Sequence, residues 1–277
     1  MASRNEAVLM PKPFSIATWN INSVRLRIGL VEDFLTRHQP DILCLQEIKC
    51  QNDQFPAGAF AELGYEHQAV HGQKSYHGVA TVSKIPMRDQ VSTDFCGKGD
   101  ARHVQTVIDT SSGPVCIQNF YVPAGGDIPD VAKNPKFQHK LDFLDEMKLL
   151  SATAGAMPHI LVGDLNIAPL ETDVWSHKQL LKVVSHTPVE TDGLNEVQSA
   201  GGWADVMRQH IPAEETLFTW WSYRSPDWDK ADKGRRLDHI WTAPALAEKL
   251  RDVTVLREAR GWEKPSDHAP VIARFDI

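Results

Sequence analysis

Short apolar segments that are typical of β-strands alternate with helical patterns along most of this chain. Residues 14–19 alternate apolar and polar side chains. A helical stripe of apolar residues follows, from about Ser23 as its N-cap to a point before Pro40. A second helical pattern covers about 135–154, and further strand-like segments lie at 41–46, 79–83, 103–109, 115–120, 159–163, 236–241, 252–256 and 270–275. Strands and helices mixed in this way predict a layered α/β core rather than a helical bundle or an all-β sandwich.

The length and composition are those of an ordinary globular protein. The chain has 277 residues, of which 42 % are apolar and 23 % charged, so an intrinsically disordered chain is excluded. No apolar run approaches the roughly 20 residues of a membrane-spanning helix, so no association with membranes is expected. The apolar run at 8–10 is too short for a signal peptide. Because no linker or low-complexity tract follows, we expect one folded domain over 13–277, preceded by a tail over 1–12.

Net charge and cysteine usage restrict the partners and the compartment. The chain has 29 Lys and Arg against 36 Asp and Glu, which gives a formal charge of −7. This charge excludes a protein that coats nucleic acid by bulk attraction, but it leaves room for a local basic surface. Cys44 and Cys116 stand inside strand-like segments, and no Cys-x-x-Cys pair occurs, so we expect buried, inert thiols. These features favour the reducing environment of the cytoplasm.

Polar side chains that can bind a metal or move a proton stand at the ends of several predicted strands. They are Asn20, Glu47, Tyr121, Asp164, Asn166, Asp238, Asp267 and His268. Loops at strand ends are where a rigid sheet presents reactive groups, so these side chains could meet at one site. Taken singly, each also has an ordinary structural explanation. Asp164 suits a turn, Glu47 a solvent-facing position, and Asp238 an ion pair with Arg235 or Arg236.

The residues around these positions make the pattern more specific. Six short motifs occur in order over residues 14–273: Thr18-Trp19-Asn20-Ile21-Asn22-Ser23-Val24-Arg25, Leu45-Gln46-Glu47, Tyr121-Val122-Pro123, Gly163-Asp164-Leu165-Asn166-Ile167-Ala168-Pro169, Arg236-Leu237-Asp238 and Ser266-Asp267-His268. In these motifs the chain resembles the exonuclease III family of AP endonucleases, within the endonuclease/exonuclease/phosphatase superfamily. The resemblance implies a deoxyribonuclease I-like fold, a four-layer α/β sandwich in which helices flank two packed mixed β-sheets.

The resemblance also implies a metal ion. Glu47 is the implied principal ligand of Mg²⁺, with Asn20 in support and Asp267 at a second or outer position, and Mn²⁺ is able to substitute. A hard cation held by one or two carboxylates suits a phosphate oxygen. It polarises the phosphorus and stabilises the leaving oxygen.

Catalytic roles follow from the same resemblance. Asp164 is the implied group that orients and deprotonates the attacking water, while Asn166 and Tyr121 contact the phosphate. His268, paired with Asp238, stabilises the charge that develops on the phosphate, because a neighbouring carboxylate favours the imidazolium form. Since mechanisms proposed for this family exchange the roles of Asp164 and His268, both assignments stay open.

A segment rich in aromatic and basic residues, 219–236, points to the substrate. From Arg224 to Arg236, five Lys and Arg stand against three Asp, a local basic surplus in an acidic chain. Such a segment suits insertion beside an extruded nucleotide and contact with phosphates. The resemblance implies that this loop enters duplex DNA and that Trp220 and Leu237 line the pocket for a baseless sugar. The other implied DNA contacts are Arg25, Tyr76, Arg102 and Arg224.

Three positions depart from the pattern of the family. Ala124 replaces a polar side chain that is common there, so one phosphate contact is expected to be missing. Asn22 stands where some relatives carry Asp, which weakens a role as a metal ligand. Arg235 stands where some relatives have an aromatic pocket wall, so the selectivity of the pocket is open. None of the three belongs to the central hydrolytic set.

The expected function is that of a monomeric, Mg²⁺-dependent DNA repair nuclease. It would cut double-stranded DNA 5′ to abasic sites and remove 3′ blocking groups or 3′ nucleotides. A phosphatase or phosphodiesterase of the same superfamily acting on a small phosphorylated molecule is the first alternative, but it has less use for the segment 219–236. A catalytically silent DNA- or partner-binding module is the second. It would tolerate loss of Glu47, Asp164 or His268, yet all three are present.

Overall fold

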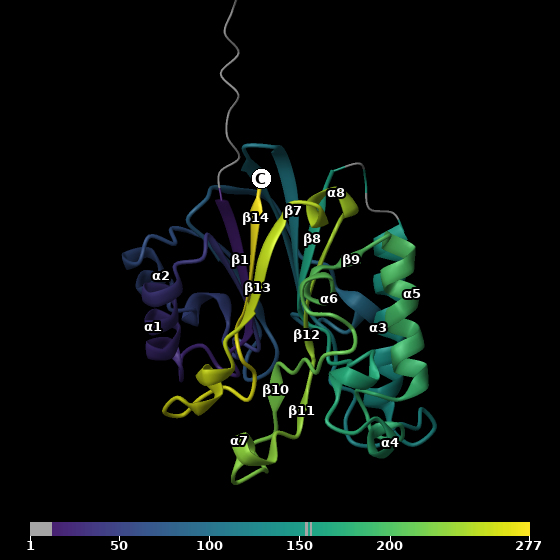
Figure 1. The fold of residues 1–277 in the computed structure, drawn as a ribbon. Coiled ribbons are helices and arrows are strands. Elements are labelled where there is room, and N and C mark those ends of the chain that lie inside the picture. The colour runs from purple at the N-terminus through teal and green to yellow at the C-terminus, as the bar shows by residue number, and fades with distance from the viewer. Residues whose placement is uncertain (1–12, 153–154, 156) are drawn as a thin grey trace, which may run out of the picture.

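Two six-stranded mixed β-sheets pack face to face in the computed structural model, which describes residues 13–152, 155 and 157–277 (Figure 1). The expected tail over 1–12 lies outside the described residues. The first sheet contains, in spatial order, β13 (Leu250–Val255), β14 (Val271–Asp276), β1 (Pro13–Asn20), β2 (Ile42–Gln46), β4 (Val79–Ser83) and β3 (His67–His71). Within it, β1 and β2 are parallel, and the other neighbours are antiparallel.

The second sheet repeats this mixed pattern. In spatial order it contains β5 (Met87–Val91), β6 (His103–Thr110), β7 (Gly113–Tyr121), β8 (His159–Asp164), β12 (Asp238–Thr242) and β9 (Ala204–Asp205). Its one parallel pair is β7 with β8. A separate two-stranded ribbon, β10 (Trp220–Trp221) with β11 (Gly234–Arg235), extends below the sheets in Figure 1.

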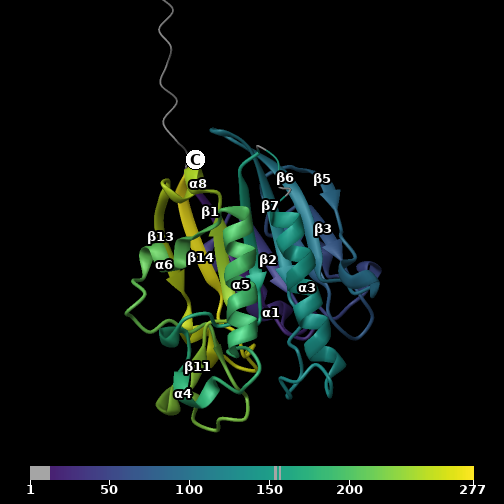
Figure 2. The same cartoon turned by 90° about the vertical axis from the view of Figure 1, so that its right-hand side faces the viewer.

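Helices cover the outer face of each sheet. In Figure 1, α1 (Ile28–His38) and α2 (Ala57–Glu62) lie beside the first sheet, and Figure 2 shows α3 (Pro135–Ala152) and α5 (Pro188–Gly201) across the second. The remaining helices are short: α4 (His177–Leu180), α6 (Val206–His210), α7 (Trp228–Ala231) and α8 (Pro244–Ala247). No helix in the described ranges combines the length and the apolar character that crossing a membrane requires. The helix–sheet–sheet–helix order confirms the predicted four-layer fold class.

Three apolar layers hold this sandwich together. The central layer lies between the sheets and includes Ile16, Ile117 and Val162. The outer layers pack α1 on the first sheet, and α3 with α5 on the second. Cys44 and Cys116 are buried and free, as predicted, and burial raises the pKa of both thiols to about 12.

The predicted strands are all present, with ends shifted by one or two residues, but the first helix begins later than predicted. Ser23 is not its N-cap, because α1 starts at Ile28 with Arg27 as its N-cap. Asn22 and Ser23 have positive φ angles, and the backbone N–H of Ser23 donates to the carbonyl of Glu47 at 2.7 Å. Because Ser23 pairs with the backbone that follows β2, the helix begins only after this segment. The predicted end of α3 at Ala154 lies outside the described residues.

Helix α5 was not predicted, although the sequence marks it clearly. Thr187 and Glu190 form a capping box, with Pro188 at the first helical position and Gly202 as an αL C-cap. The apolar stripe of this helix is narrow, with Leu194 and Val197 buried, which explains why periodicity alone did not reveal it.

Two ion pairs join α3 to α5, one buried and one exposed. Lys140 donates from Nζ to Glu190 Oε1 at 2.5 Å with both side chains fully buried, whereas the pair of Lys148 with Glu196 is solvent-exposed. We expect Lys140→Met to lower the free energy of unfolding by about 3–5 kcal/mol, because Glu190 would remain as an uncompensated buried charge. The matched Lys148→Met should change stability little. Urea unfolding measures the stability of both variants. Equal unfolding midpoints for the two would contradict this account.

Candidate active site

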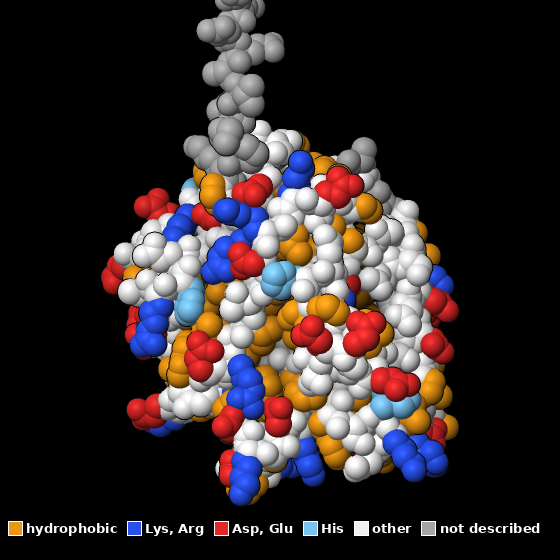
Figure 3. Space-filling view, in the orientation of Figure 1, with side chains coloured by type: hydrophobic (Ala, Val, Ile, Leu, Met, Phe, Trp, Pro, Cys, Tyr) orange, Lys and Arg blue, Asp and Glu red, His pale blue; other side chains and the backbone are white. Residues whose placement is uncertain are grey.

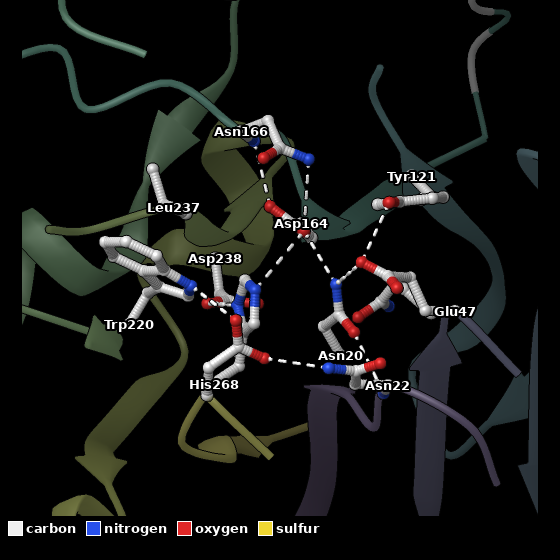
Figure 4. Close-up of polar contacts among 12 residues, drawn as sticks. Asn20, Asn22, Glu47, Tyr121, Asp164, Asn166, Trp220, Leu237, Asp238 and His268 are labelled. Atoms are coloured by element: carbon white, nitrogen blue, oxygen red, sulfur yellow. Dashed lines mark hydrogen bonds and ion pairs between the residues drawn. The ribbon is translucent and has the colours of Figure 1, made fainter. Parts of the chain in front are cut away.

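The site lies where strands from both sheets end at the same edge of the sandwich. Asn20 ends β1, and Glu47 directly follows β2, which runs parallel to β1. Tyr121 and Asp164 end the parallel strands β7 and β8 of the other sheet and pair in register. Asp238 opens β12, opposite Asp164 in the antiparallel register. Face-to-face packing therefore brings polar groups from five strands together (Figure 4).

Glu47 is held by three donors from different elements. Its Oε1 accepts from Asn20 Nδ2 at 3.0 Å and from the hydroxyl of Tyr121 at 2.8 Å. Its Oε2 lies 2.7 Å from Lys49 Nζ. Burial acts to raise the pKa of Glu47, but Lys49 and these hydrogen bonds outweigh it and hold the pKa below its usual range. The carboxylate is therefore ionised at neutral pH.

Asp164 lies at the centre of the hydrogen-bond network and is 1 % exposed. Its Oδ2 accepts from Asn20 Nδ2 at 2.9 Å and from Asn166 Nδ2 at 3.1 Å, while its Oδ1 accepts the backbone N–H of Asn166 at 2.9 Å. Burial raises the pKa of Asp164 to about 7, against the opposing effect of His268. A carboxylate poised in this way can accept a proton near neutral pH.

His268 forms a dyad with Asp238 and also faces Asp164. Its Nδ1 donates to Asp238 Oδ2 at 2.8 Å, and its Nε2 lies 3.7 Å from Asp164 Oδ2. Asp238 also accepts from the hydroxyl of Thr219 at 2.6 Å. Although burial opposes it, the two carboxylates raise the pKa of His268 to about 10, so the imidazolium form persists at neutral pH.

Oxygen atoms beside Glu47 fit a hard divalent cation. Asp267 accepts from Asn22 Nδ2 at 3.2 Å and from Trp220 Nε1 at 2.9 Å, and these neutral donors leave its charge uncompensated. Lys49 Nζ lies between Glu47 Oε2 and the side-chain oxygen of Asn22, at 2.7 and 2.5 Å, which marks a place where a cation is favourable. Carboxylate and amide oxygens are the ligands that Mg²⁺ prefers.

Asn20 was predicted to support the metal ion, but its side chain bonds other protein groups and does not offer an oxygen as a direct ligand. Its amide nitrogen faces Glu47 and Asp164, while its oxygen accepts the backbone N–H of Asn22 at 3.1 Å. A second group, Asp164, Asp238 and His268, has ligand atoms within 4.8 Å of one another. It is less suited to a metal, because a protonated imidazole has no lone pair to offer.

A cavity of about 850 Å³ opens from this cluster toward the β10–β11 ribbon. Trp220 and Leu237, both predicted to line a pocket, do so together with Trp175, Lys233 and Arg235. Arg224 also lines the cavity and is exposed. In Figure 4 the ring of Trp220 lies on the side of the site away from Glu47 and Tyr121.

The other predicted DNA-contact residues differ in accessibility. Arg25 and Tyr76 are exposed, Tyr76 to 68 %. Arg102 is only 6 % exposed, and its Nε donates to Asp100 at 3.0 Å while its guanidinium stacks over the ring of Tyr121 at 4.9 Å. In this position Arg102 supports Tyr121, and little of it is available to a DNA strand. Ala124, exposed on the cavity wall, offers no polar contact.

Three contributors to the site were missed by the sequence analysis. Lys49 stands two residues after Glu47, and Thr219 is the first residue of the segment 219–236, so their positions were an available signal. Lys140 gave no signal, because its role depends on tertiary contacts. Its Nζ donates to the carbonyl of Asn166 at 2.8 Å.

Comparison with known proteins agrees with this geometry. Residues 17–268 match the model of the Endonuclease/Exonuclease/phosphatase family. The chain belongs to this family. It is 33 % identical to the exodeoxyribonuclease III of Haemophilus influenzae over 93 % of this chain and 98 % of that protein. The resemblance predicted from the six motifs is therefore confirmed.

Solved structures of the same family have closely similar folds. An AP endonuclease from Archaeoglobus fulgidus superposes with a TM-score of 0.87 at 32 % identity, covering 95 % of this chain and 100 % of that one. A 3′ phosphatase from Neisseria bound to a product DNA hairpin superposes with a TM-score of 0.86 at 33 % identity, with the same coverage.

The His268–Asp238 dyad of this family member makes a direct prediction for the metal-free protein. Asp238→Asn should lower the pKa of His268, because the carboxylate that favours the imidazolium is replaced by a neutral amide. Nuclear magnetic resonance of the imidazole should show His268 protonated at pH 8 in the parent protein and substantially neutral in the variant. Asp252→Asn, which removes an exposed partner of Arg274, is the matched control. A His268 titration unchanged by Asp238→Asn would refute the proposed electrostatic cause.

Proposed function

We propose that this chain is a Mg²⁺-dependent DNA repair nuclease that hydrolyses the phosphodiester 5′ to abasic sites and removes 3′ blocking groups or 3′ nucleotides from duplex DNA. The proposal rests above all on one observation, the buried carboxylate of Asp164 between His268 and the Asn20–Glu47 pair. The relatives named above include an exodeoxyribonuclease, an AP endonuclease and a DNA-bound 3′ phosphatase, which supports this range of activities. We assign the activity to a single catalytic domain over 13–277.

Glu47 and Asp267 would hold the metal ion in this proposal. When bound, Mg²⁺ supplies positive charge that polarises the phosphoryl group and stabilises the leaving oxygen. Asn20 supports the site by donating to both Glu47 and Asp164, which keeps two carboxylates close together despite their mutual repulsion. Tyr121 holds Glu47 in place through its hydroxyl and would contact the phosphate of the substrate.

Asp164 is the group best placed to take a proton from the attacking water. It is a carboxylate with a pKa raised toward neutrality, and Asn20 and Asn166 orient its oxygens. His268 already carries its proton at neutral pH, so it suits stabilisation of negative charge on the phosphate better than proton abstraction. This favours one of the two assignments that the sequence left open.

The segment 219–236, which contains β10 and β11, and the adjoining Leu237 favour DNA over a small phosphorylated molecule. Trp220 and Leu237 line the cavity beside the catalytic groups, and exposed Arg224 extends the cavity rim. Figure 3 shows acidic and basic side chains interspersed over the visible face, including the projection around α7, rather than a continuous basic surface. We therefore expect weak, strongly salt-dependent binding to undamaged DNA, and a grip on the substrate that relies on shape and on the metal site. A monomeric state and a cytoplasmic location are part of the proposal.

The first test is cleavage of a duplex that carries one tetrahydrofuran abasic analogue. Mg²⁺ should support a single nick 5′ to the analogue, Mn²⁺ should replace Mg²⁺, and EDTA should abolish the product, because hydrolysis requires the cation. An undamaged duplex with a recessed 3′ end, run in parallel, measures exonuclease activity. Intact DNA in both assays, with turnover of a small phosphate ester instead, would establish the phosphatase alternative.

The second test separates catalysis from binding. Asp164→Asn should slow cleavage by about 10²–10⁴-fold, because the amide cannot accept the proton of water. Binding to the abasic duplex, measured by fluorescence anisotropy, should stay within a few-fold of the parent value, since no repulsive charge is added. Cleavage by Asp164→Asn at the parental rate would show that another group acts as the base.

A further inference from the structure

Arg235 is a largely buried cation that lines the cavity and has no carboxylate partner in the part of the chain that the structure describes. Its Nη1 donates to two uncharged acceptors, the carbonyl of Val184 at 3.0 Å and the hydroxyl of Ser185 at 2.7 Å. Its Nε–H is buried and has no hydrogen-bond partner among the described residues. Its guanidinium lies over the ring of Trp220, 5.3 Å from the centroid.

The neighbouring arginine, by contrast, has carboxylates that neutralise its buried charge. Arg236 is fully buried and pairs with Asp173 at 2.8 Å and with Asp205 at 2.6 Å. For Arg235, the carboxylate that influences it most is Glu190, but Glu190 is already engaged by Lys140 at 2.5 Å and by the backbone N–H of Ser185. A buried guanidinium without a counter-charge is costly, so its retention inside the cavity calls for an explanation.

A second cation and a second aromatic ring line the same cavity. Lys233 Nζ lies 4.6 Å from the centroid of the Trp175 ring, and both residues line the cavity with Trp220, Arg235 and Leu237. Lys233 likewise makes no ion pair within the described ranges. The lining also contains four carboxylates, and the Asp267 carboxylate accepts from Nε1 of Trp220, whose ring Arg235 covers.

We propose that Arg235, assisted by Lys233, selects for a carboxylate on the group that leaves with the phosphate, namely a 3′ fragment produced by oxidation of a sugar. This inference rests on the proposed function, in which the phosphate lies beside Asp164 and the group attached to it enters the cavity. A neutral baseless sugar would need only the apolar walls of Trp220 and Leu237. Val184 and Ser185 engage only Nη1 of Arg235, so Nη2 of this cavity-lining guanidinium is left to donate to a carboxylate oxygen.

The simplest such substrate is a duplex that ends in 3′-phosphoglycolate. In the hydrolysis, the OH of water adds to phosphorus, the bond from phosphorus to the 3′ oxygen breaks, and that oxygen gains the remaining hydrogen. The DNA is left with a 3′ hydroxyl, and phosphoglycolate is released with its carboxylate intact. Arg235 touches only that carboxylate, so it acts as a specificity determinant and takes no part in bond breaking.

The test compares two duplexes that differ only at the end of the 3′ fragment. One carries 3′-phosphoglycolate, and the other carries the uncharged 2-hydroxyethyl phosphodiester. We expect the parent protein to prefer the carboxylate in kcat/KM by about tenfold or more, as a charge-assisted hydrogen bond provides. Equal values for the two substrates in the parent protein would overturn the inference, whereas turnover of neither would count against the proposed function itself.

Variants then assign the preference to the side chain. Arg235→Gln should remove most of the preference by slowing only the carboxylate substrate, and Arg235→Lys should keep part of it, because the charge remains without the fork. The matched control is Arg251→Gln, which removes the exposed ion pair of Arg251 with Asp276 at the far end of the first sheet. This variant should leave the ratio unchanged. If Arg235→Gln slowed both substrates equally, Arg235 would serve only to hold Trp220. If that variant did not fold, the ratios of the parent protein and of Arg235→Lys would still decide the matter.

Discussion

The side-chain amide of Asn20 joins the two halves of the active site, and most of the remaining geometry depends on it. It comes from the first sheet and donates to Glu47 of the same sheet and to Asp164 of the second. One amide can reach both carboxylates only because the sheets pack face to face and end at the same edge. The apolar layer between the sheets therefore has a function beyond stability. It determines the distance between the group proposed to hold the metal and the group proposed to activate water.

Charge balance explains how so many acids remain together in a dry site. His268 lies between Asp238 and Asp164 and is held in its charged form, while Lys49 neutralises part of Glu47. The net charge of −7 thus overstates the acidity that DNA would meet, because several of these acids are compensated inside the site. Electrostatic steering by the whole protein would be weak, and recognition would depend on the cavity and its aromatic and cationic walls.

The cavity also shows where this family member departs from its pattern. Its lining contains the residues expected from the motifs, and it also contains Arg235, one of the positions that depart from the expected pattern, together with Lys233. The Lys140–Glu190 pair contacts this lining at two places, since Lys140 donates to the carbonyl of Asn166 and Glu190 accepts the backbone N–H of Ser185. The residues proposed for catalysis and for selectivity therefore share one buried support.

The sequence by itself determined the fold class, the family and the identity of the groups at the strand ends, because strand periodicity and short motifs are local features. It placed Asp164, Asp238 and His268 in one site by their motifs, and the structure brings them into contact. Only the tertiary structure decided that α1 begins at Ile28, that Arg102 is buried behind Tyr121, and that Lys140 donates to the carbonyl of Asn166. Each of these depends on a neighbour distant in sequence. The same holds for Arg235, whose unpaired charge becomes visible only when every carboxylate around it has been placed.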